Sequence, residues 1–244
     1  MEAVLQANPK YPLAYELAAF YFYREQYGDA VRVLEQWKQQ FPDAAPAPRS
    51  RYLTCLAIAQ QFAGDTQDAI AATSGNMAPH LARATLLLQP GEVARAQDSV
   101  AQIEVKPGAA DDALMKDAII EYVKTAGASD RHIEHSRNCN RALYFSLLGW
   151  LDPAAELFER LATELSDNLF LVHQSALLHT QLRDNADAPA LAIARYEQCV
   201  RLQPRFRTAY LQLVTLATNA KDDAAALRYI DQGLAAFPDE PSFL

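Results

Sequence analysis

Residues 207–240 read RTAYLQLVTLATNAKDDAAALRYIDQGLAAFPDE, and this stretch decides the fold. This stretch reads as two short helices followed by a proline turn. Large and small side chains stand at eight fixed positions in it, which we call slots. These slots hold Tyr210, Leu213, Val214, Ala217, Ala226, Ile230, Gly233 and Pro238. Small residues occur where two helices cross closely and large ones where the crossing must be filled, so the pattern predicts a helical hairpin.

The same slots recur about every 34 residues toward the N-terminus. One period earlier, with about four extra residues at 184–189, they hold Ala176, Ala192, Tyr196, Cys199 and Pro204. The period before that has Ala142, Phe145, Gly149, Leu151, Ala154 and Phe158. Near the N-terminus the slots hold Leu17, Ala18, Tyr21, Tyr27, Ala30, Leu34 and Pro42. The repetition predicts a stack of hairpins, each packed on its neighbours.

Between residues 45 and 134 the repeat is degenerate but remains helical. The expected helices are Arg51–Phe62, a short Asp68–Thr73, His80–Leu88, Glu92–Ile103 and Asp111–Thr125. Gly127 is expected to break the last of these. No run alternates strictly between apolar and polar residues and no Asn-Gly or Asp-Gly hairpin signal occurs, so the predicted fold class is all-α.

These slots resemble the tetratricopeptide repeat family. The resemblance implies one right-handed superhelical solenoid over residues 1–244, with clear units at 11–44, 135–168, 169–206 and 207–240 and degenerate hairpins at 45–134. It also implies that the first helix of each unit lines a concave groove that holds a segment of a partner protein. The implied groove positions are Tyr15, Ala19, Phe22, Tyr23, His173, Leu177, Thr180, Gln181, Leu211, Thr215, Thr218 and Asn219. The first unit lacks the Lys, Asn and Arg of the subclass that clamps acidic chaperone tails, which disfavours that activity.

Aromatic residues crowd the first unit beyond the needs of the repeat. They are Tyr11, Tyr15, Phe20, Tyr21, Phe22, Tyr23 and Tyr27. Because aromatic side chains anchor interfaces, we predict that Tyr15, Phe22 and Tyr23 contact a partner or a second copy of the chain. The alternative is that residues 1–10 fold back and cover them. The predicted partner-binding residues are therefore Tyr15, Phe22, Tyr23, His173, Leu177 and Gln181.

Charge and motifs argue against nucleic-acid binding and catalysis. The chain has 22 basic and 30 acidic residues, a net charge of -8, and its basic residues are scattered, whereas nucleic-acid binding needs them clustered. No phosphate-binding glycine loop, nucleophile elbow or zinc-protease pair occurs. We expect no enzymatic activity, no catalytic residue and no cofactor.

One cluster has metal-ligand residue types, namely His132, Glu134, His135 and Cys139. The spacing puts His132, His135 and Cys139 on one helix face. A closed zinc site needs four ligands, and the cluster supplies three. The alternative is a buried cysteine beside histidines at a polar helix start, so we predict no metal site.

The chain is expected to be cytoplasmic. Its apolar stretches are far shorter than the about 20 residues that span a bilayer. Residues 1–10 lack the basic start and apolar run of a signal peptide. The three cysteines, Cys55, Cys139 and Cys199, are odd in number and far apart, which suits reduced thiols.

A second resemblance concerns the order of the units. The order is similar to that of the coatomer epsilon subunit family in three features: a shortened second helix pair ending near 73–79, a long helix at 111–125 and a widened turn at 184–189. Two short stretches also resemble that family locally, Met77–Ala82 and Arg228–Gln232. The predicted function is thus a non-enzymatic scaffold that binds a partner protein in its groove. The alternative is a coat subunit that clasps a helical tail of a larger subunit.

Overall fold

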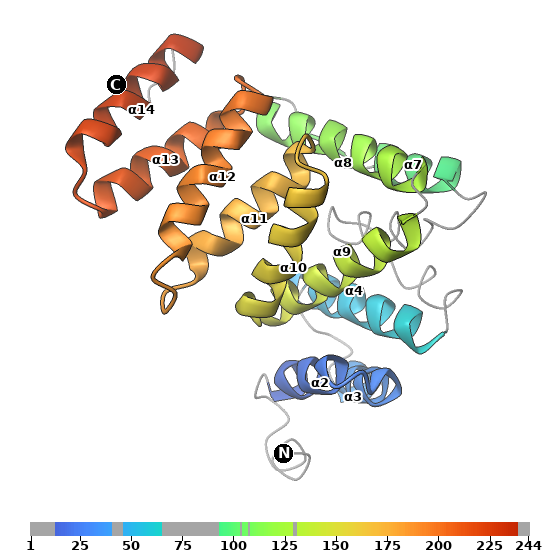
Figure 1. Cartoon of the computed structure of the whole chain (residues 1–244). Helices are drawn as coiled ribbons and strands as arrows, with labels where there is room; N and C mark the ends of the chain where they lie inside the picture. Colours follow the sequence, from blue (N-terminus) through green and yellow to red (C-terminus); the bar gives the residue numbers. More distant parts are fainter. Residues whose placement is uncertain are drawn as a thin grey trace. The chain divides into compact units, whose positions relative to one another are not determined.

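A computed structural model describes residues 13–40, 46–64, 93–102, 104–106, 108–128 and 131–238 of the chain. All regular secondary structure in these residues is helical (Figure 1). This confirms the all-α class, as expected for apolar residues spaced three or four apart without alternation. The expected helices Asp68–Thr73 and His80–Leu88 lie outside the described residues. None of the helices in the described ranges is long and apolar enough to cross a membrane.

The described residues fall into two compact units, one within 1–104 and 123–154, the other within 105–122 and 155–244. The first contains α2 (Leu13–Tyr23), α3 (Tyr27–Gln40), α4 (Pro46–Ala63), α7 (Val93–Ala101) and α9 (His132–Leu148). The second contains most of α8 (Ala110–Ala128) and α10 (Leu151–Glu164), with α11 (Leu169–Gln181), α12 (Ala188–Leu202), α13 (Arg207–Asn219) and α14 (Asp223–Ala236). The single superhelical solenoid stays a prediction.

The first unit has an aromatic core. Helix α2 packs on α3, α3 on α4, and α9 on both α4 and α2. The Phe22 ring is fully buried and stacks on the Tyr144 ring of α9, with 3.9 Å between centroids. The buried Tyr144 hydroxyl donates to the backbone oxygen of Ala18 at 3.2 Å, which satisfies its polar atom. Buried Ala18 and Ala19 let α9 approach α2 this closely.

The second unit stacks its last four helices in order. Helix α12 packs against both α11 and α13, and α13 packs against α14 (Figure 1). The small slot residues at these crossings are fully or almost fully buried, namely Ala176, Ala192, Cys199 and Ala217. Tyr196 and Phe206 fill the remaining space. Most slots of the sequence pattern therefore lie in the core of this unit, while Val214 and Ile230 are half-buried.

Most helix boundaries in the degenerate region 45–134 differ from the sequence prediction by one or two residues, and two differ by more. Helix α8 continues through Gly127 to Ala128, because a glycine inside a helix costs only about 1 kcal/mol and does not end it. Helix α4 begins at Pro46 rather than Arg51, since proline is well tolerated in a first helical turn. Gly149, which occupies a small-residue slot in the pattern, ends α9 in a left-handed conformation with φ of 84°. The amide of Trp150 then closes the turn on Phe145.

Candidate functional site

The predicted partner-binding residues of α11 are a half-buried histidine, a half-buried leucine and an exposed glutamine. His173 packs edge-to-face against Phe206 and Tyr196, with centroid distances of 5.1 and 6.1 Å. Its buried Nδ1 has no hydrogen-bond partner within the described part of the chain. Burial lowers the pKa of His173 to about 4, although Asp111 acts in the opposite direction. His173 therefore has a packing role, and its contact with a partner stays a prediction.

Leu177 and Gln181 remain accessible on α11. Leu177 is half-buried and Gln181 is exposed, with its amide donating to the Leu177 carbonyl oxygen at 3.4 Å. On α13 the side chains of Thr215, Thr218 and Asn219 are exposed as well. The two threonine hydroxyls donate to carbonyl oxygens of their own helix at 2.8 Å, so both hydroxyl oxygens keep acceptor capacity toward solvent.

We call seven side chains of α11 and α13 the neutral face, because none of them is charged. They are Leu177, Thr180, Gln181, Leu211, Thr215, Thr218 and Asn219. Helix α11 contains no Asp, Glu, Lys or Arg, and α13 contains only Arg207 at its first position. Second helices of the hairpins carry the charges instead, with Arg195, Glu197 and Arg201 on α12 as an example. The neutral face offers apolar groups and neutral hydrogen-bonding groups.

The structure corrects the prediction for Phe22. We predicted from the surplus of aromatic residues that Phe22 contacts a partner, but its ring is 0% exposed. Besides Tyr144 it touches Phe62 at 4.9 Å and Phe145 at 5.7 Å between centroids. These residues come from α4 and α9, which are distant in sequence. Phe22 is a core residue because the fold brings these three rings from distant helices around it, in addition to the nearby Tyr27 of α3.

Tyr15 and Tyr23 have different surroundings from Phe22. Tyr15 is half-buried against Trp37 of α3, with 5.7 Å between centroids. Tyr23 is 57% exposed and lies 5.8 Å from the ring of Trp150. The Trp150 indole nitrogen donates to Glu16 at 3.0 Å, which fixes its ring. Tyr23 and Trp150 form an accessible aromatic pair of the first unit, and the 40% exposed Phe20 lies beside Tyr21, with 5.9 Å between centroids.

The cluster with metal-ligand residue types is only partly described. His135 and Cys139 are both buried in α9. The side chain of His132 lies outside the described residues. Among the side chains that are described, no three His, Cys, Asp or Glu residues come close enough to hold a metal ion.

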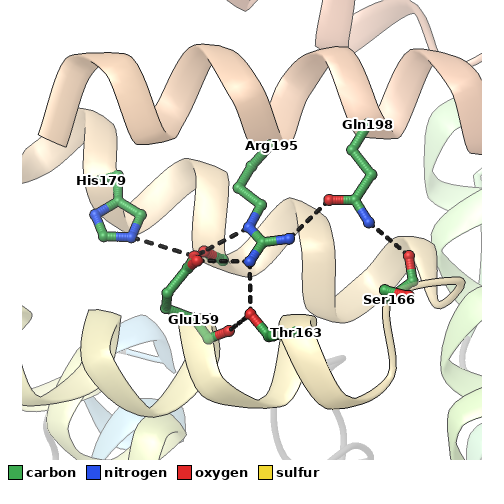
Figure 2. Close-up of polar contacts among 7 residues, drawn as sticks. Glu159, Thr163, Ser166, His179, Arg195 and Gln198 are labelled. Carbon is green, nitrogen blue, oxygen red and sulfur yellow. Dashed lines mark hydrogen bonds and ion pairs between the residues drawn. The ribbon is translucent and has the colours of Figure 1, made fainter.

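A polar network that the sequence analysis did not predict joins α10, α11 and α12 (Figure 2). Arg195 of α12 binds the Glu159 carboxylate of α10 with two nitrogens, Nε at 3.0 Å and Nη2 at 2.5 Å. The same guanidinium donates to Thr163 Oγ1 at 2.8 Å and to Gln198 Oε1 at 2.7 Å. Such a two-pronged contact is the strongest form of ion pair between side chains.

Helix α11 contributes two further contacts to Glu159. The Ser175 hydroxyl donates to Glu159 Oε2 at 2.6 Å, and His179 Nε2 lies 3.5 Å from the same oxygen. His179, Arg195 and Ser175 hold the pKa of the Glu159 carboxyl well below its usual range, while partial burial acts in the opposite direction. The Glu159 carboxylate therefore stays ionised, and both of its oxygens accept hydrogen bonds within the network. The network fixes three helices, and its side chains are committed to one another.

A signal for this network is present in the sequence. The slots that hold Leu213 and Ala217 in the last unit hold Ser175 and His179 one unit earlier. A polar residue in a core slot requires a buried polar partner, since burying an unpaired polar group is costly. The partners, Glu159 and Arg195, lie on two other helices, so their pairing could be recognised only once the hairpins were stacked.

Comparison with known proteins gives no assignment. No family model matches the chain, and no curated protein matches it. The resemblances to tetratricopeptide proteins and to the coatomer epsilon subunit therefore rest on the residues quoted for them.

Proposed function

We propose that this chain is a non-enzymatic scaffold that binds a segment of another protein through the neutral face. In this proposal the hairpins form a tetratricopeptide-like right-handed superhelix, and α11 and α13 lie on its inner side. The observation that carries the proposal is the contrast within the last two hairpins. Their first helices, α11 and α13, have accessible side chains without charge apart from Arg207, whereas their second helices, α12 and α14, carry charged side chains. A surface that only had to stay soluble would be expected to carry charged side chains on every accessible helix.

The composition of the neutral face defines the kind of partner. Leu177 and Leu211 supply apolar contact, and the amides of Gln181 and Asn219 can each both donate and accept. A partner segment with apolar and neutral polar side chains would satisfy these groups. A strongly acidic or basic segment would lose hydration without gaining an opposite charge. A helix or an extended segment laid across two first helices is a usual mode of recognition by helical repeats.

The proposal includes a cytosolic location. The three cysteines are free and buried, which suits a reducing compartment. The proposed partner is a protein, and no cofactor is needed to complete the neutral face.

Site-specific photo-crosslinking tests the proposal. A benzophenone amino acid would replace Leu177, Gln181 or Thr215 on the neutral face, and Glu156 or Leu227 as controls on second helices. Both control positions are exposed, so they report non-specific capture. We expect the same adduct from the three test positions and none of it from the controls. Equal adducts at all five positions, or adducts only at the controls, would overturn the proposal.

A further inference from the structure

The second helices of successive hairpins contact each other through residues in equivalent slots. We call the contact of α10 with α12 the first step and the contact of α12 with α14 the second step. Glu159 and Glu197 each lie five positions after the small slot residues Ala154 and Ala192 of their units. In the first step Glu159 accepts from Arg195, three positions after Ala192. The second step pairs Glu197 with Tyr229, which occupies the slot of Arg195 one unit later. The Tyr229 hydroxyl donates to Glu197 Oε1 at 2.7 Å.

The second step leaves open a space that the first step fills. An open hollow of about 590 Å³ lies between α12, α13 and α14. Its lining residues are Glu197, Val200, Arg201, Tyr210, Leu213, Gln232, Ala235 and Ala236. Four of them stand in the slots of network members, Glu197 for Glu159, Arg201 for Thr163, Leu213 for Ser175 and Gln232 for Gln198. The hollow is thus the counterpart of the place where the Arg195 guanidinium is bound in Figure 2.

Polar groups of the hollow are left unused within the described part of the chain. Glu197 Oε2 makes no hydrogen bond there, since Tyr229 binds only the other oxygen. Gln232 and Arg201 are exposed and have no hydrogen bond or ion pair with any described residue. Glu197 and Arg201 lie one helical turn apart on α12, yet they do not pair with each other. A carboxylate oxygen, an amide and a guanidinium therefore border one hollow, each free to bind a ligand.

We propose that this hollow binds a guanidino acid, a ligand that carries a guanidinium group and a carboxylate, as arginine does. The guanidinium would take the place that Arg195 takes in the preceding step, on Glu197 Oε2 and the Gln232 amide oxygen. Arg201, which replaces Thr163, would bind the carboxylate. Leu213, Val200 and Ala235 supply apolar wall for the methylene groups between the two charges.

The charges of the hollow select such a ligand over simpler ions. A cation without a carboxylate would meet Glu197 but also the repulsion of Arg201. An anion without a guanidinium would bind Arg201 but would be repelled by Glu197. A ligand with both charges satisfies both residues, whereas each of the simpler ions leaves one residue of the hollow without an opposite charge and meets a like charge. This site uses residues other than the neutral face, so it holds or fails independently of the proposed function.

The test is a titration of the ¹⁵N-labelled protein with L-arginine, followed through the side-chain amide of Gln232 and the backbone amides of α14. We expect saturable shifts at concentrations up to about 10 mM. L-Citrulline has the same shape with a neutral ureido group, and arginine methyl ester lacks the carboxylate. Both should bind at least about tenfold more weakly, since each leaves one charge of the hollow unpaired. Binding of citrulline as tight as that of L-arginine would overturn the proposal.

Variants assign the binding to the hollow. Glu197→Gln keeps an acceptor for Tyr229 but removes the charge, and should weaken L-arginine binding at least about tenfold. Glu156→Gln removes one exposed carboxylate from α10 and should leave binding unchanged. Tyr229→Arg restores the arginine of the preceding step and should block the hollow. If Tyr229→Arg does not fold, Glu197→Gln decides, and unchanged binding by Glu197→Gln would contradict the proposal.

The ligand could be a free amino acid or the C-terminal arginine of a polypeptide. The peptide Ala-Ala-Arg with a free carboxylate distinguishes the two sources. Tighter binding of the peptide than of L-arginine would assign the hollow to a polypeptide C-terminus, and tighter binding of L-arginine would assign it to the free amino acid. Failure of both would overturn the proposal.

Discussion

At the scale of single residues, Glu159 shows how a charge is kept between helices. Its side chain is 28% exposed, and that of Arg195 is 15% exposed. Removing ions from water is costly, and the cost is recovered only when every lone pair and proton finds a partner. Arg195 and Ser175 provide those partners here. The pair is therefore sensitive to the loss of either member, whereas a solvent-exposed pair is not.

Arg195→Ala should lower the free energy of unfolding by about 2–3 kcal/mol, because it leaves the Glu159 carboxylate without its main partner. Arg160→Ala is the matched control, since Arg160 is 55% exposed and binds Glu164 of the same helix. The control should cost less than about 1 kcal/mol. Urea unfolding of both variants measures the difference. Equal losses would show that the network stabilises no more than a surface pair.

His173 gives a pH dependence whose sign follows from its burial. Its pKa is about 4 in the folded chain and 6.5 for an ordinary histidine. Between these values the unfolded chain binds a proton that the folded chain does not. The contribution of neutral His173 to the free energy of unfolding is therefore fully present above pH 6.5. It is lost as the pH decreases toward 4, by up to about 3 kcal/mol.

The variant His173→Phe isolates this effect. Phenylalanine keeps the ring contact with Phe206 and cannot titrate, and the buried Nδ1 has no partner in the described structure to lose. We expect the stability difference between wild type and variant to change between pH 6.5 and 4 and to be constant above pH 7. Urea unfolding across this range measures it. If the stability difference between wild type and variant did not vary with pH, His173 would not be the source of the pH dependence.

At the scale of helices, α13 depends on a cap from a distant element. Phe206 precedes α13 and provides no side-chain cap. Asp111 of α8 accepts instead from the amides of Arg207 at 3.1 Å and Thr208 at 2.8 Å, and from the Thr208 hydroxyl. A carboxylate at this point satisfies free amides and interacts favourably with the helix dipole.

Asp111→Ala should therefore destabilise the protein by about 1–2 kcal/mol, as the loss of an N-cap does. Asp112→Ala is the control, because Asp112 is the next residue in the first turn of α8 and is exposed. Hydrogen exchange should also accelerate at the amides of Arg207 and Thr208 in the first variant alone. Similar losses in both variants would mean that the charge acts on α8 and not on α13.

The sequence predicted those elements whose signals are local. The slots of the last two units identified α11 to α14 and most of their buried small residues, while partner contact by Leu177 and Gln181 stays a prediction. The burial of Phe22 was missed because it depends on Tyr144, which is far away in the sequence. The role of Asp111 was missed for the same reason. Contacts between separate hairpins determine both, and a repeat period does not encode them.

At the scale of the whole molecule, the distribution of charge matters more than its total. The chain carries a net charge of -8, yet the neutral face contributes nothing to it. Charges on the second helices favour solubility, and they leave the proposed contact surface without a long-range electrostatic attraction. Recognition would depend on shape, apolar contact and neutral hydrogen bonds.

Binding of the crosslinked partner should therefore depend little on salt. Dissolved salt screens the attraction between opposite charges. At 0.15 M salt the Debye length, over which this attraction decays, is about 8 Å. An interface without charges at its centre is expected to change its dissociation constant by less than about threefold between 50 and 300 mM salt. Isothermal titration calorimetry of the purified pair measures this, and Gln181→Lys serves as the positive control because it introduces a charge. A wild-type affinity that fell steeply with salt would locate the contact on the charged second helices instead, since only an interface rich in ion pairs loses affinity in that way.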